Sequence, residues 1–248
     1  MEHLLRATAN AEARHFWFRG FRAFILPLVQ LALKGRSSAR ILDCGCGTGA
    51  NVELLSRFGR AFGFDLSSVG LRLGHDAGRT RLAQATVTAA PFPGSSFDLV
   101  TSFDVLYSLE TPAERAAVAE MFRLTRPGGY VLINVAAMPL LRGDHSVLSR
   151  EVRRYSRNEL QRLVADAGFA ITRLTYTNVT LFPPLALIRF LHRWRGLARE
   201  EQAHGEIAVP WAPLNTLLTG VLLLEGAWIR RFNAPFGSSL LCLARKPA

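Results

Sequence analysis

Short apolar runs alternate with longer stretches of helical periodicity along most of the chain. The first run, Ala39 to Leu42, leads into a glycine-rich segment, DCGCGTG, and then into a helical stretch. Further runs follow in RAFGFD, in Leu82 to Ala85, in FDLVTSF, where Leu99 to Ser102 should be buried, and in YVLINVA. Strands that alternate with helices at this spacing are typical of parallel βαβ units. We therefore expect an α/β fold with a doubly wound, mostly parallel sheet.

Capping residues mark the start of two of the predicted helices. Thr111 is expected to be an N-cap, with Pro112 at the first helical position and Glu114 completing a capping box. This helix should end at the RPGG segment, before the strand YVLINVA. Ser156 and Glu159 predict a second capping box in the same way.

The second half of the chain continues the alternation but contains a long insertion. FAITRLTY and SSLLCLARK predict two further strands, and residues 178–236 lie between them. Apolar residues recur at helical spacing in the insertion. The predicted stripe consists of Leu214, Leu217, Leu218, Val221 and Trp228. We expect such an insertion to cover a substrate site.

The glycine-rich segment after the first strand is the strongest candidate for a ligand site. Such a turn lets a ligand approach the backbone closely. Gly45, Gly47 and Ala50 fit the G-x-G-x-x-G/A pattern of dinucleotide-binding proteins. Gly45, Gly47 and Gly49 also fit a denser spacing, with an acid at Asp43. The segment alone leaves both interpretations open.

The charge of the chain is strongly positive and comes almost entirely from arginine. The formal net charge of the 248 residues is +11, and Lys34 and Lys246 are the only lysines. An anionic partner such as nucleic acid, an acidic metabolite or a phospholipid surface is one interpretation. A biased composition spread over a solvated surface is the other. The chain lacks a lysine-rich tail and the spacing of a zinc finger, so we expect no nucleic-acid partner.

The cysteines and the apolar segments indicate a cytoplasmic protein. Three cysteines, two of them in the glycine-rich segment, fit a reducing compartment and no disulfide framework. The spacing shows no metal site, and the N-terminal segment does not resemble a signal peptide. Leu217 to Leu224 is too short to span a bilayer before Glu225 interrupts it. Peripheral contact with the inner face of the membrane remains a hypothesis.

Five segments together resemble the class I S-adenosylmethionine-dependent methyltransferases. These segments are ILDCGCGTG, GFDLS, APFPGSSFDLV, FDVLYSL and RLTRPGGYVLINV, in this order, within residues 39–135. The chain is also similar to a bacterial subgroup with an N-terminal HFWF-x-G segment, here His15 to Gly20, and an RRYS-x-x-EL element, here Arg153 to Leu160. The resemblance implies a Rossmann-like methyltransferase fold with a seven-stranded sheet.

The resemblance also implies a division of the chain. Residues 1–38 are expected to form an N-terminal helical lid, and residues 39–177 the α/β core that binds S-adenosylmethionine. Residues 178–236 are expected to form a helical insertion before the last strand, and residues 237–248 that strand.

By the same resemblance, the glycine-rich segment binds S-adenosylmethionine rather than NAD, and S-adenosylhomocysteine is the product. The family places an acid at the end of the first strand near the amino-acid end of the cofactor, and an acid at the end of the second strand on the ribose hydroxyls. A carboxylate suits two hydroxyls because it accepts two donors. Thr86 departs from the family, which often has aspartate there. The implied cofactor-binding residues are Asp43, Gly45, Cys46, Gly47, Gly49, Asp65, Leu66, Thr86, Val87 and Phe103.

Methyl transfer depends mainly on in-line positioning and on the exclusion of water, although some hydroxyl and carbon acceptors also need a general base. The mouth of the sheet offers Asp104 and Tyr107 after the fourth strand and His145 after the fifth. Related sequences frequently have histidine where Ser108 and Glu151 stand, so two potential bases of the family are missing here. Cys44 and Cys46 are interpreted as packing residues.

The methyl acceptor is expected to be a small molecule, apolar or lipid-like, methylated on oxygen or carbon. Trp17, Arg153, Arg154 and Tyr155 are the candidate substrate-binding residues. Structural ion pairs are the alternative role for the two arginines, and a buried helix is the alternative for the segment around Trp17. Two other functions stay open, a non-catalytic S-adenosylmethionine-binding protein and an NAD(P)-dependent oxidoreductase. The latter lacks a recognisable Tyr-x-x-x-Lys pair.

Overall fold

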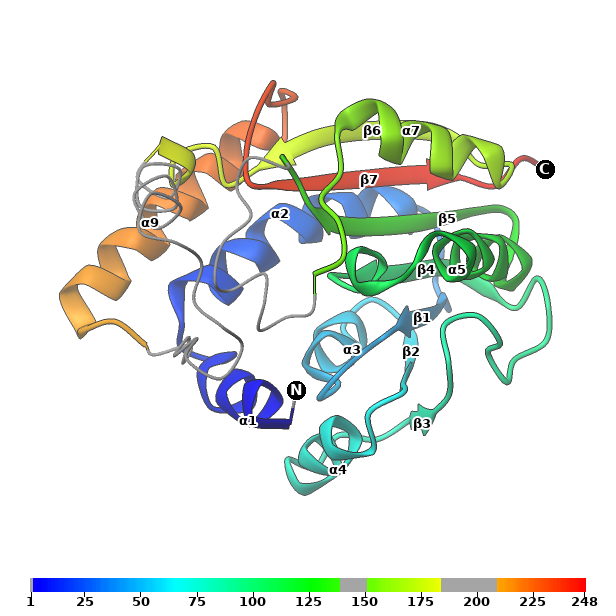
Figure 1. Ribbon diagram of the computed structural model, residues 1–248, viewed down its shortest axis with the longest axis horizontal. Coiled ribbons are helices and arrows are strands. Elements are labelled where there is room, and N and C mark those ends of the chain that lie inside the picture. Colours follow the sequence, from blue (N-terminus) through cyan, green and yellow to red (C-terminus); the bar gives the residue numbers. More distant parts are fainter. Residues whose placement is uncertain (1, 139–150, 184–208) are drawn as a thin grey trace.

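The computed structural model describes residues 2–138, 151–183 and 209–248, and these residues form one twisted sheet with helices on both faces (Figure 1). The seven strands of this part of the chain have the order β3-β2-β1-β4-β5-β7-β6. Their bounds are β1 Arg40–Cys44, β2 Arg60–Asp65, β3 Leu82–Gln84, β4 Phe97–Phe103, β5 Thr125–Ala136, β6 Ala170–Thr177 and β7 Ser239–Arg245. The helices are α1 Glu2–Ala11, α2 Phe16–Ala32, α3 Ala50–Leu55, α4 Ser68–Asp76, the 3-10 turn η1 Leu106–Ser108, α5 Thr111–Leu124, α7 Arg157–Asp166 and α9 Ala212–Ile229.

The strand directions confirm the predicted doubly wound fold. Neighbouring strands are parallel across β3, β2, β1, β4 and β5, whereas β7 is antiparallel to both β5 and β6. The order of the strands reverses between β1 and β4, which are neighbours in the sheet. In open α/β sheets, ligands bind at such a reversal, beyond the carboxyl ends of the strands.

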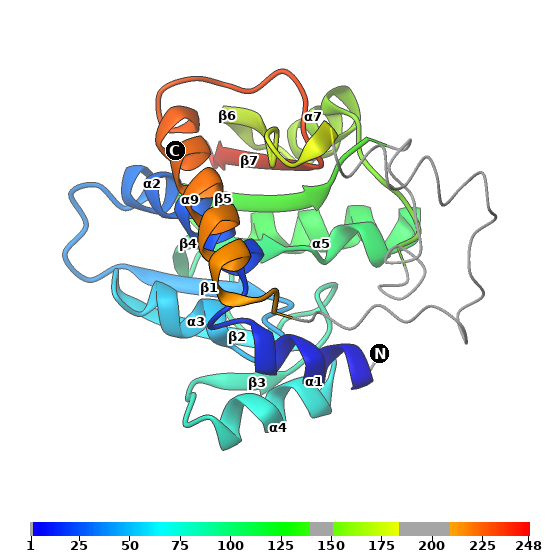
Figure 2. The ribbon, with the colours of Figure 1, turned by 90° about the vertical axis from the view of Figure 1, so that its left-hand side faces the viewer.

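Two apolar layers cover the sheet and separate the helices into two sets. Buried residues of α2, α3 and α9 pack on one face, and those of α5 and α7 pack on the other. Figure 2 shows the two sets on opposite sides of the strands. The central strands β1, β4 and β7 are buried on both faces, and all of β4 is inaccessible to solvent or nearly so. This explains why the strands have continuous apolar runs rather than alternating patterns.

The predicted cap of α5 is wrong, and that of α7 is confirmed. The N-cap of α5 is Glu110 rather than Thr111, and no side chain caps this helix end. Glu114 is turned away because it accepts hydrogen bonds from Arg153 and Tyr155. The strand β5 also begins at once after α5, so it includes the RPGG segment that was expected to precede it. Ser156 and Glu159 form the expected capping box of α7.

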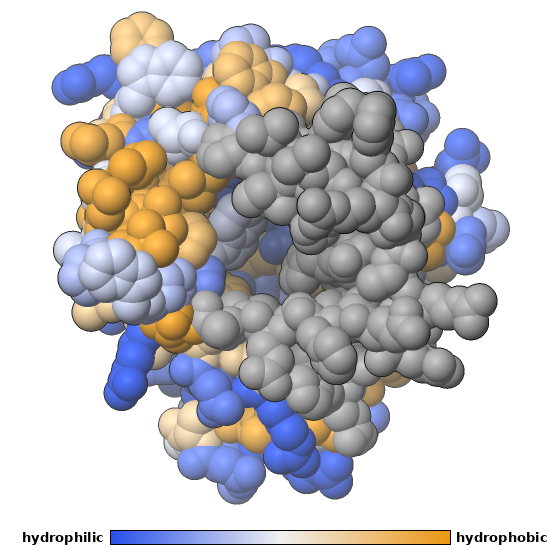
Figure 3. Space-filling model, turned by 60° about the vertical axis from the view of Figure 1, so that its left-hand side comes forward, coloured by the Kyte–Doolittle hydropathy of each residue, from blue (hydrophilic) through white to orange (hydrophobic). Residues whose placement is uncertain are grey.

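The helix α9 faces the core with a different stripe from the one that its sequence predicted. Leu217 and Trp228, two members of the predicted stripe, are among the most exposed large apolar side chains of the described residues. Figure 3 shows apolar surface gathered on this side of the molecule. The buried stripe of α9 consists of Asn215, Thr219, Leu222, Glu225, Gly226 and Ile229. Periodicity identified a helix correctly, but the more polar of its faces is the one that packs.

Two glycines allow α9 to lie close to α2. A Cβ atom at Gly20 would lie 2.4 Å from Cδ1 and 2.6 Å from Cβ of Leu222. A Cβ atom at Gly226 would lie 3.0 Å from Cβ of Ala23. A side chain at Gly226 would therefore be a tight fit, and one at Gly20 would force the two helices to shift.

We therefore expect Gly20→Ala to destabilise the protein by about 1–3 kcal/mol, as overpacking does, even though alanine favours a helix. The measurement is the free energy of unfolding from urea denaturation. Gly220→Ala is the matched control, since a Cβ atom at Gly220 would meet nothing within 4 Å, and it should leave stability unchanged or raise it. Equal stability of Gly20→Ala and the wild type would contradict the close packing of α2 on α9.

Candidate active site

The glycine-rich turn between β1 and α3 has one open side. Gly45, Gly47 and Gly49 have positive φ angles of 78°, 55° and 80°, a region that side chains disfavour. A Cβ atom at Gly45 would lie 2.3 Å from Cγ2 of Val105, so this residue is enclosed. At Gly47 the nearest atom would be 4.0 Å away. A ligand can therefore approach the backbone of the turn at Gly47.

Asp43 lies at the carboxyl end of β1, beside β4, and is buried. Its Oδ1 accepts a hydrogen bond of 2.6 Å from Oγ1 of Thr101. None of the residues that the structure describes donates to its Oδ2. Burial raises the pKa of Asp43 to about 7, the bond from Thr101 opposes this, and the charge of Asp65 adds to it. An unpartnered buried acceptor is costly, so this oxygen fits an N–H donor of a bound ligand.

Asp65 holds the turn at the carboxyl end of β2. One of its oxygens accepts a hydrogen bond of 2.8 Å from the amide of Gly47, and the other accepts one of 2.7 Å from the amide of Ser67. Each carboxylate oxygen can accept a further donor. The position therefore fits the predicted ribose contact and also has a structural role in the turn.

The predicted cofactor-binding residues Leu66, Thr86 and Val87 lie near Asp65 in the sheet or beyond it. The side chain of Leu66 is largely exposed, and its backbone oxygen accepts a hydrogen bond of 3.1 Å from Nε2 of Gln84. Thr86 shares a hydrogen bond of 3.0 Å with the hydroxyl of Thr88, and Val87 is half-buried. The structure thus brings Leu66 and the segment after β3 to one edge of the site.

A cavity of about 260 Å³ lies between the N-terminal helices and the glycine-rich turn. Its lining includes the predicted residues Trp17, Gly45, Cys46, Gly47, Phe103, Asp104 and Tyr107. It also includes Ala50, the last position of the G-x-G-x-x-G/A pattern, and residues that the sequence did not single out, namely Leu5, Thr8, Glu12, Phe18, Phe21, Arg22, Thr48 and Asn51. Ligand pockets usually have volumes of about 300–1,000 Å³, so the N-terminal helices lie closer to the turn than a bound cofactor and acceptor require.

Glu12 connects the N-terminal helices to the turn. It is buried just after α1, and its Oε2 accepts a hydrogen bond of 2.7 Å from Oγ1 of Thr48. Its Oε1 forms an ion pair of 2.5 Å with Nη2 of Arg79. The Nη1 atom of the same arginine donates to the backbone oxygen of Thr48. Arg22 of α2 donates to the backbone oxygen of Glu12. We call Glu12, Thr48 and Arg79 the clasp, because they fasten the N-terminal helices to the turn.

Asp104 lines the cavity from the carboxyl end of β4 and carries a titratable side chain. It follows β4 in a strained backbone conformation, with a φ of 61°. Its Oδ1 accepts a hydrogen bond of 2.9 Å from Nδ2 of Asn134. The residue is exposed to solvent at the cavity that it lines. Desolvation by the protein atoms around the carboxyl group raises the pKa of Asp104 to about 6; Asn134 opposes the shift, Glu151 adds to it, and Arg154 opposes it.

The other candidate bases are placed differently. Tyr107 lines the cavity from η1, and its backbone oxygen accepts hydrogen bonds from the amides of Val152 and Arg153. His145 lies outside the described residues. Burial raises the pKa of the thiols of Cys44 and Cys46, so neither is a thiolate at neutral pH, which supports their interpretation as packing residues.

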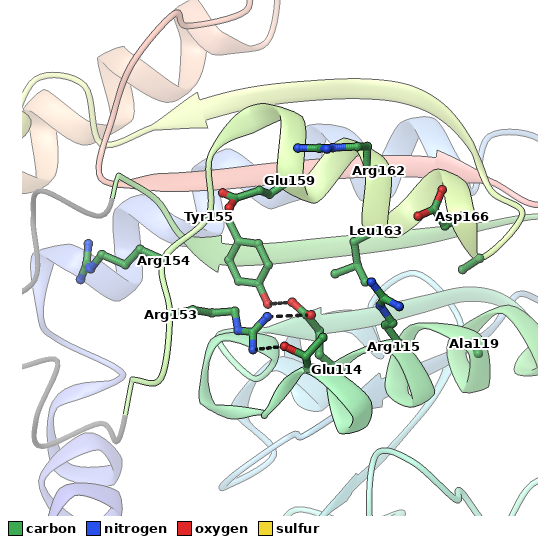
Figure 4. Close-up of a pocket in the computed structure, with 12 residues that line it drawn as sticks. Glu114, Arg115, Ala119, Arg153, Arg154, Tyr155, Glu159, Arg162, Leu163 and Asp166 are labelled. Atoms are coloured by element: carbon green, nitrogen blue, oxygen red, sulfur yellow. Dashed lines mark hydrogen bonds and ion pairs between the residues drawn. The ribbon is translucent and has the colours of Figure 1, made fainter.

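Arg153 and Tyr155 do not line the cavity beside the glycine-rich turn. They line a second cavity of about 550 Å³ between α5 and α7, shown in Figure 4. Arg153 forms an ion pair of 2.9 Å with Glu114, and the hydroxyl of Tyr155 donates to the same carboxylate and to the backbone oxygen of Leu106. Burial and the contact with Glu114 raise the pKa of Tyr155. These contacts favour a structural role over the predicted substrate contact.

In Figure 4 the side chain of Arg154 extends away from those of Arg153, Tyr155 and Glu114. It forms an ion pair with Glu151 and donates a hydrogen bond of 3.0 Å to the backbone oxygen of Ala137. Glu151, which stands where related sequences frequently have histidine, is therefore engaged with this arginine. Of the four predicted substrate-binding residues, the structure brings only Trp17 into the cavity beside the glycine-rich turn.

Comparisons with known proteins resolve the two interpretations of the glycine-rich turn. Residues 42–133 match a family model described as a methyltransferase domain. The chain is 27% identical over 186 residues to the ubiquinone/menaquinone biosynthesis C-methyltransferase UbiE of Erwinia tasmaniensis, a match that covers 58% of this chain and 71% of that protein. The UbiE protein of Yersinia pestis strain Pestoides F matches to the same extent.

Solved structures show the same fold. A methyltransferase of Thermotoga maritima has a TM-score of 0.59 and 18% identity, covering 99% of this chain and all of that one. The YcgJ protein of Bacillus subtilis has a TM-score of 0.57 and 16% identity, covering 92% and 99%. The family model and the relatives together favour S-adenosylmethionine over a dinucleotide. The family model, the UbiE relatives and the shared fold support a class I S-adenosylmethionine-dependent methyltransferase.

Proposed function

We propose that this small-molecule methyltransferase acts on an oxygen or carbon atom of an apolar or lipid-like acceptor in the cavity beside the glycine-rich turn. The observation that carries the proposal is the placement of Asp104, a carboxylate with a raised pKa, opposite an apolar wall. That wall consists of Leu5, Trp17, Phe18, Phe21 and Phe103. The name of the UbiE relatives, C-methyltransferases of ubiquinone and menaquinone biosynthesis, supports an acceptor of this class.

The cofactor supplies a methyl group on a good leaving group, and this chain positions it. Asp43, through its unpartnered Oδ2, is proposed to accept a hydrogen bond from the amino group, while Asp65 accepts from the ribose hydroxyls. The open side of Gly47 leaves room for the cofactor against the backbone. The residues present therefore fit the group that the family requires.

Asp104 is proposed to act as the general base. With a pKa of about 6 it is ionised at neutral pH, yet it is a stronger base than an ordinary aspartate. The helices α1 and α2 exclude water from the acceptor. The clasp must open to admit the substrates, because the cavity is small when closed.

The experiment that tests the proposal is incubation of the protein with methyl-labelled S-adenosylmethionine and extracts of a bacterial host. The organic-phase lipid extract should yield a labelled product, and the aqueous extract should not. Label in water-soluble products alone would contradict the acceptor class. Sustained binding of the cofactor without any labelled product would favour a non-catalytic binding protein.

Replacement of Asp65 by alanine should weaken the binding of S-adenosylmethionine at least about tenfold. The reason is the loss of charge-assisted hydrogen bonds to ribose, each on the order of 1.5–3 kcal/mol. Isothermal titration calorimetry measures the effect. Asp76→Ala, which removes an exposed carboxylate at the end of α4, is the matched control and should bind as the wild type does. A folded Asp65→Ala protein with unchanged affinity would refute the ribose assignment.

The pH profile tests the role of Asp104. A base must be ionised, so kcat/KM should rise with pH through about 6 and then level off. Asn134→Leu removes a hydrogen bond that lowers the pKa of Asp104, and should shift the profile to higher pH.

Asp104→Asn should lower kcat by about a hundredfold or more with little change in cofactor affinity. His145→Ala is the comparison, since His145 is the other predicted base. If His145→Ala abolishes turnover while Asp104→Asn keeps wild-type turnover and pH dependence, Asp104 is not the base.

A further inference from the structure

The helix α9 is polar toward the protein and apolar toward its surroundings. Leu224 is 74% exposed, Leu217 is 64% exposed and Trp228 is 45% exposed. Asn215 and Glu225, by contrast, are buried. A surface helix of a protein that meets only water has the opposite arrangement, with its apolar stripe inward.

Hydrogen bonds fix the inward face of α9, so the helix cannot rotate to bury its leucines. Glu225 accepts hydrogen bonds from the amides of Val179 and Thr180, at 2.9 and 3.0 Å, and from the hydroxyl of Thr180. Asn215 accepts from the amide of Phe16 at 2.8 Å and donates to the backbone oxygen of Arg14 at 2.9 Å. These buried polar groups would lose their partners if the helix turned.

The apolar surface continues beyond both ends of the helix. Together it forms what we call the outer face of α9, which consists of the exposed residues Trp211, Leu217, Leu223, Leu224, Trp228 and Phe232. Within α9 the only charged residue is Glu225, which is on the inward side. Figure 3 shows the apolar surface as a continuous area. A contiguous exposed patch of large apolar residues marks an interaction site.

Two features of the outer face match an anionic bilayer. Trp211 and Trp228 stand near its two ends, and tryptophan is the residue that favours the membrane–water interface. Exposed arginines lie near both ends as well, Arg14 beside the first turn and Arg230 and Arg231 after the last. A chain with a net charge of +11 is attracted to anionic headgroups.

The helix lies on the bilayer rather than across it. By length and composition, α9 is the one helix in the described part of the chain that could span a membrane. Its bonds to Arg14, Phe16, Val179 and Thr180 would have to break before lipid could surround it. Only one side is apolar and free, which is the arrangement of an interfacial helix.

We propose that the outer face of α9 docks on an anionic phospholipid bilayer. Through the close contact of α2 with α9, docking sets the cavity wall formed by Trp17, Phe18 and Phe21 next to the membrane. A lipid-like acceptor then reaches the cavity directly from the bilayer. This second step rests on the proposed function, whereas docking itself does not.

Co-sedimentation with vesicles tests the docking in the absence of any acceptor. The probes are vesicles of phosphatidylcholine alone and of phosphatidylcholine mixed with phosphatidylglycerol. The fraction of wild-type protein bound should rise with phosphatidylglycerol content and fall with added salt. Equal binding to both vesicles, or none to either, would overturn the proposal.

Variants locate the contact on α9. The double substitution Leu217→Gln and Leu224→Gln should weaken binding to the anionic vesicles at least about tenfold, because it removes apolar burial. Val152→Gln changes an exposed apolar residue whose neighbour, Arg153, contacts α5 in the opposite layer, and should bind as the wild type does. Equal binding by the double variant and the wild type would refute the site.

The same variants distinguish the bilayer from a second copy of the chain. Sedimentation velocity in the absence of lipid should show a monomer for the wild type and the double variant alike. A wild-type dimer that the double variant converts to a monomer would assign the outer face to self-association instead. Affinity for S-adenosylmethionine should be unchanged in the double variant, so that loss of docking is separated from loss of the fold or of the methyltransferase site.

Discussion

The position of the glycine-rich turn is the constraint on which the rest of the site depends, and two carboxylates impose it from opposite sides. Asp65 holds the amide of Gly47 from the end of β2, and Glu12 holds the hydroxyl of Thr48 from the end of α1. Because Arg79 bonds to both Glu12 and Thr48, the N-terminal helices, the turn and the segment after α4 form one connected network. A change in the clasp therefore alters the volume of the cavity and the access of ligands together.

Two further carboxylates follow neighbouring strands but have different surroundings. Asp43 on β1 is enclosed, with one oxygen bonded to Thr101 and the other without a partner among the described residues. Asp104 after β4 opens into the cavity and is steadied by Asn134. Desolvation raises the pKa of both, yet only Asp104 lines the cavity. Separate environments thus favour separate roles, one in binding and one in proton transfer.

Sequence patterns predicted the sheet well because strands buried on both faces leave continuous apolar runs, as in FDLVTSF. They predicted the wrong cap for α5 because tertiary contacts with Arg153 and Tyr155 recruit Glu114. Glu12 was missed since an acid near the end of an amphipathic helix carries no sign that it will meet Thr48. The orientation of α9 was missed because periodicity shows that a helix has two faces, but the partners of Asn215 and Glu225 decide which one is buried.

The most direct measurement is a crystal structure of the protein with S-adenosylhomocysteine. The amino group of the ligand should lie within hydrogen-bond distance of Oδ2 of Asp43, the ribose hydroxyls on Asp65, and the sulfur atom on the side of the cavity that Asp104 lines. The helix α1 should have moved away from the turn. A ligand bound between α5 and α7, or one at the turn with Asp43 and Asp65 out of reach, would contradict these assignments.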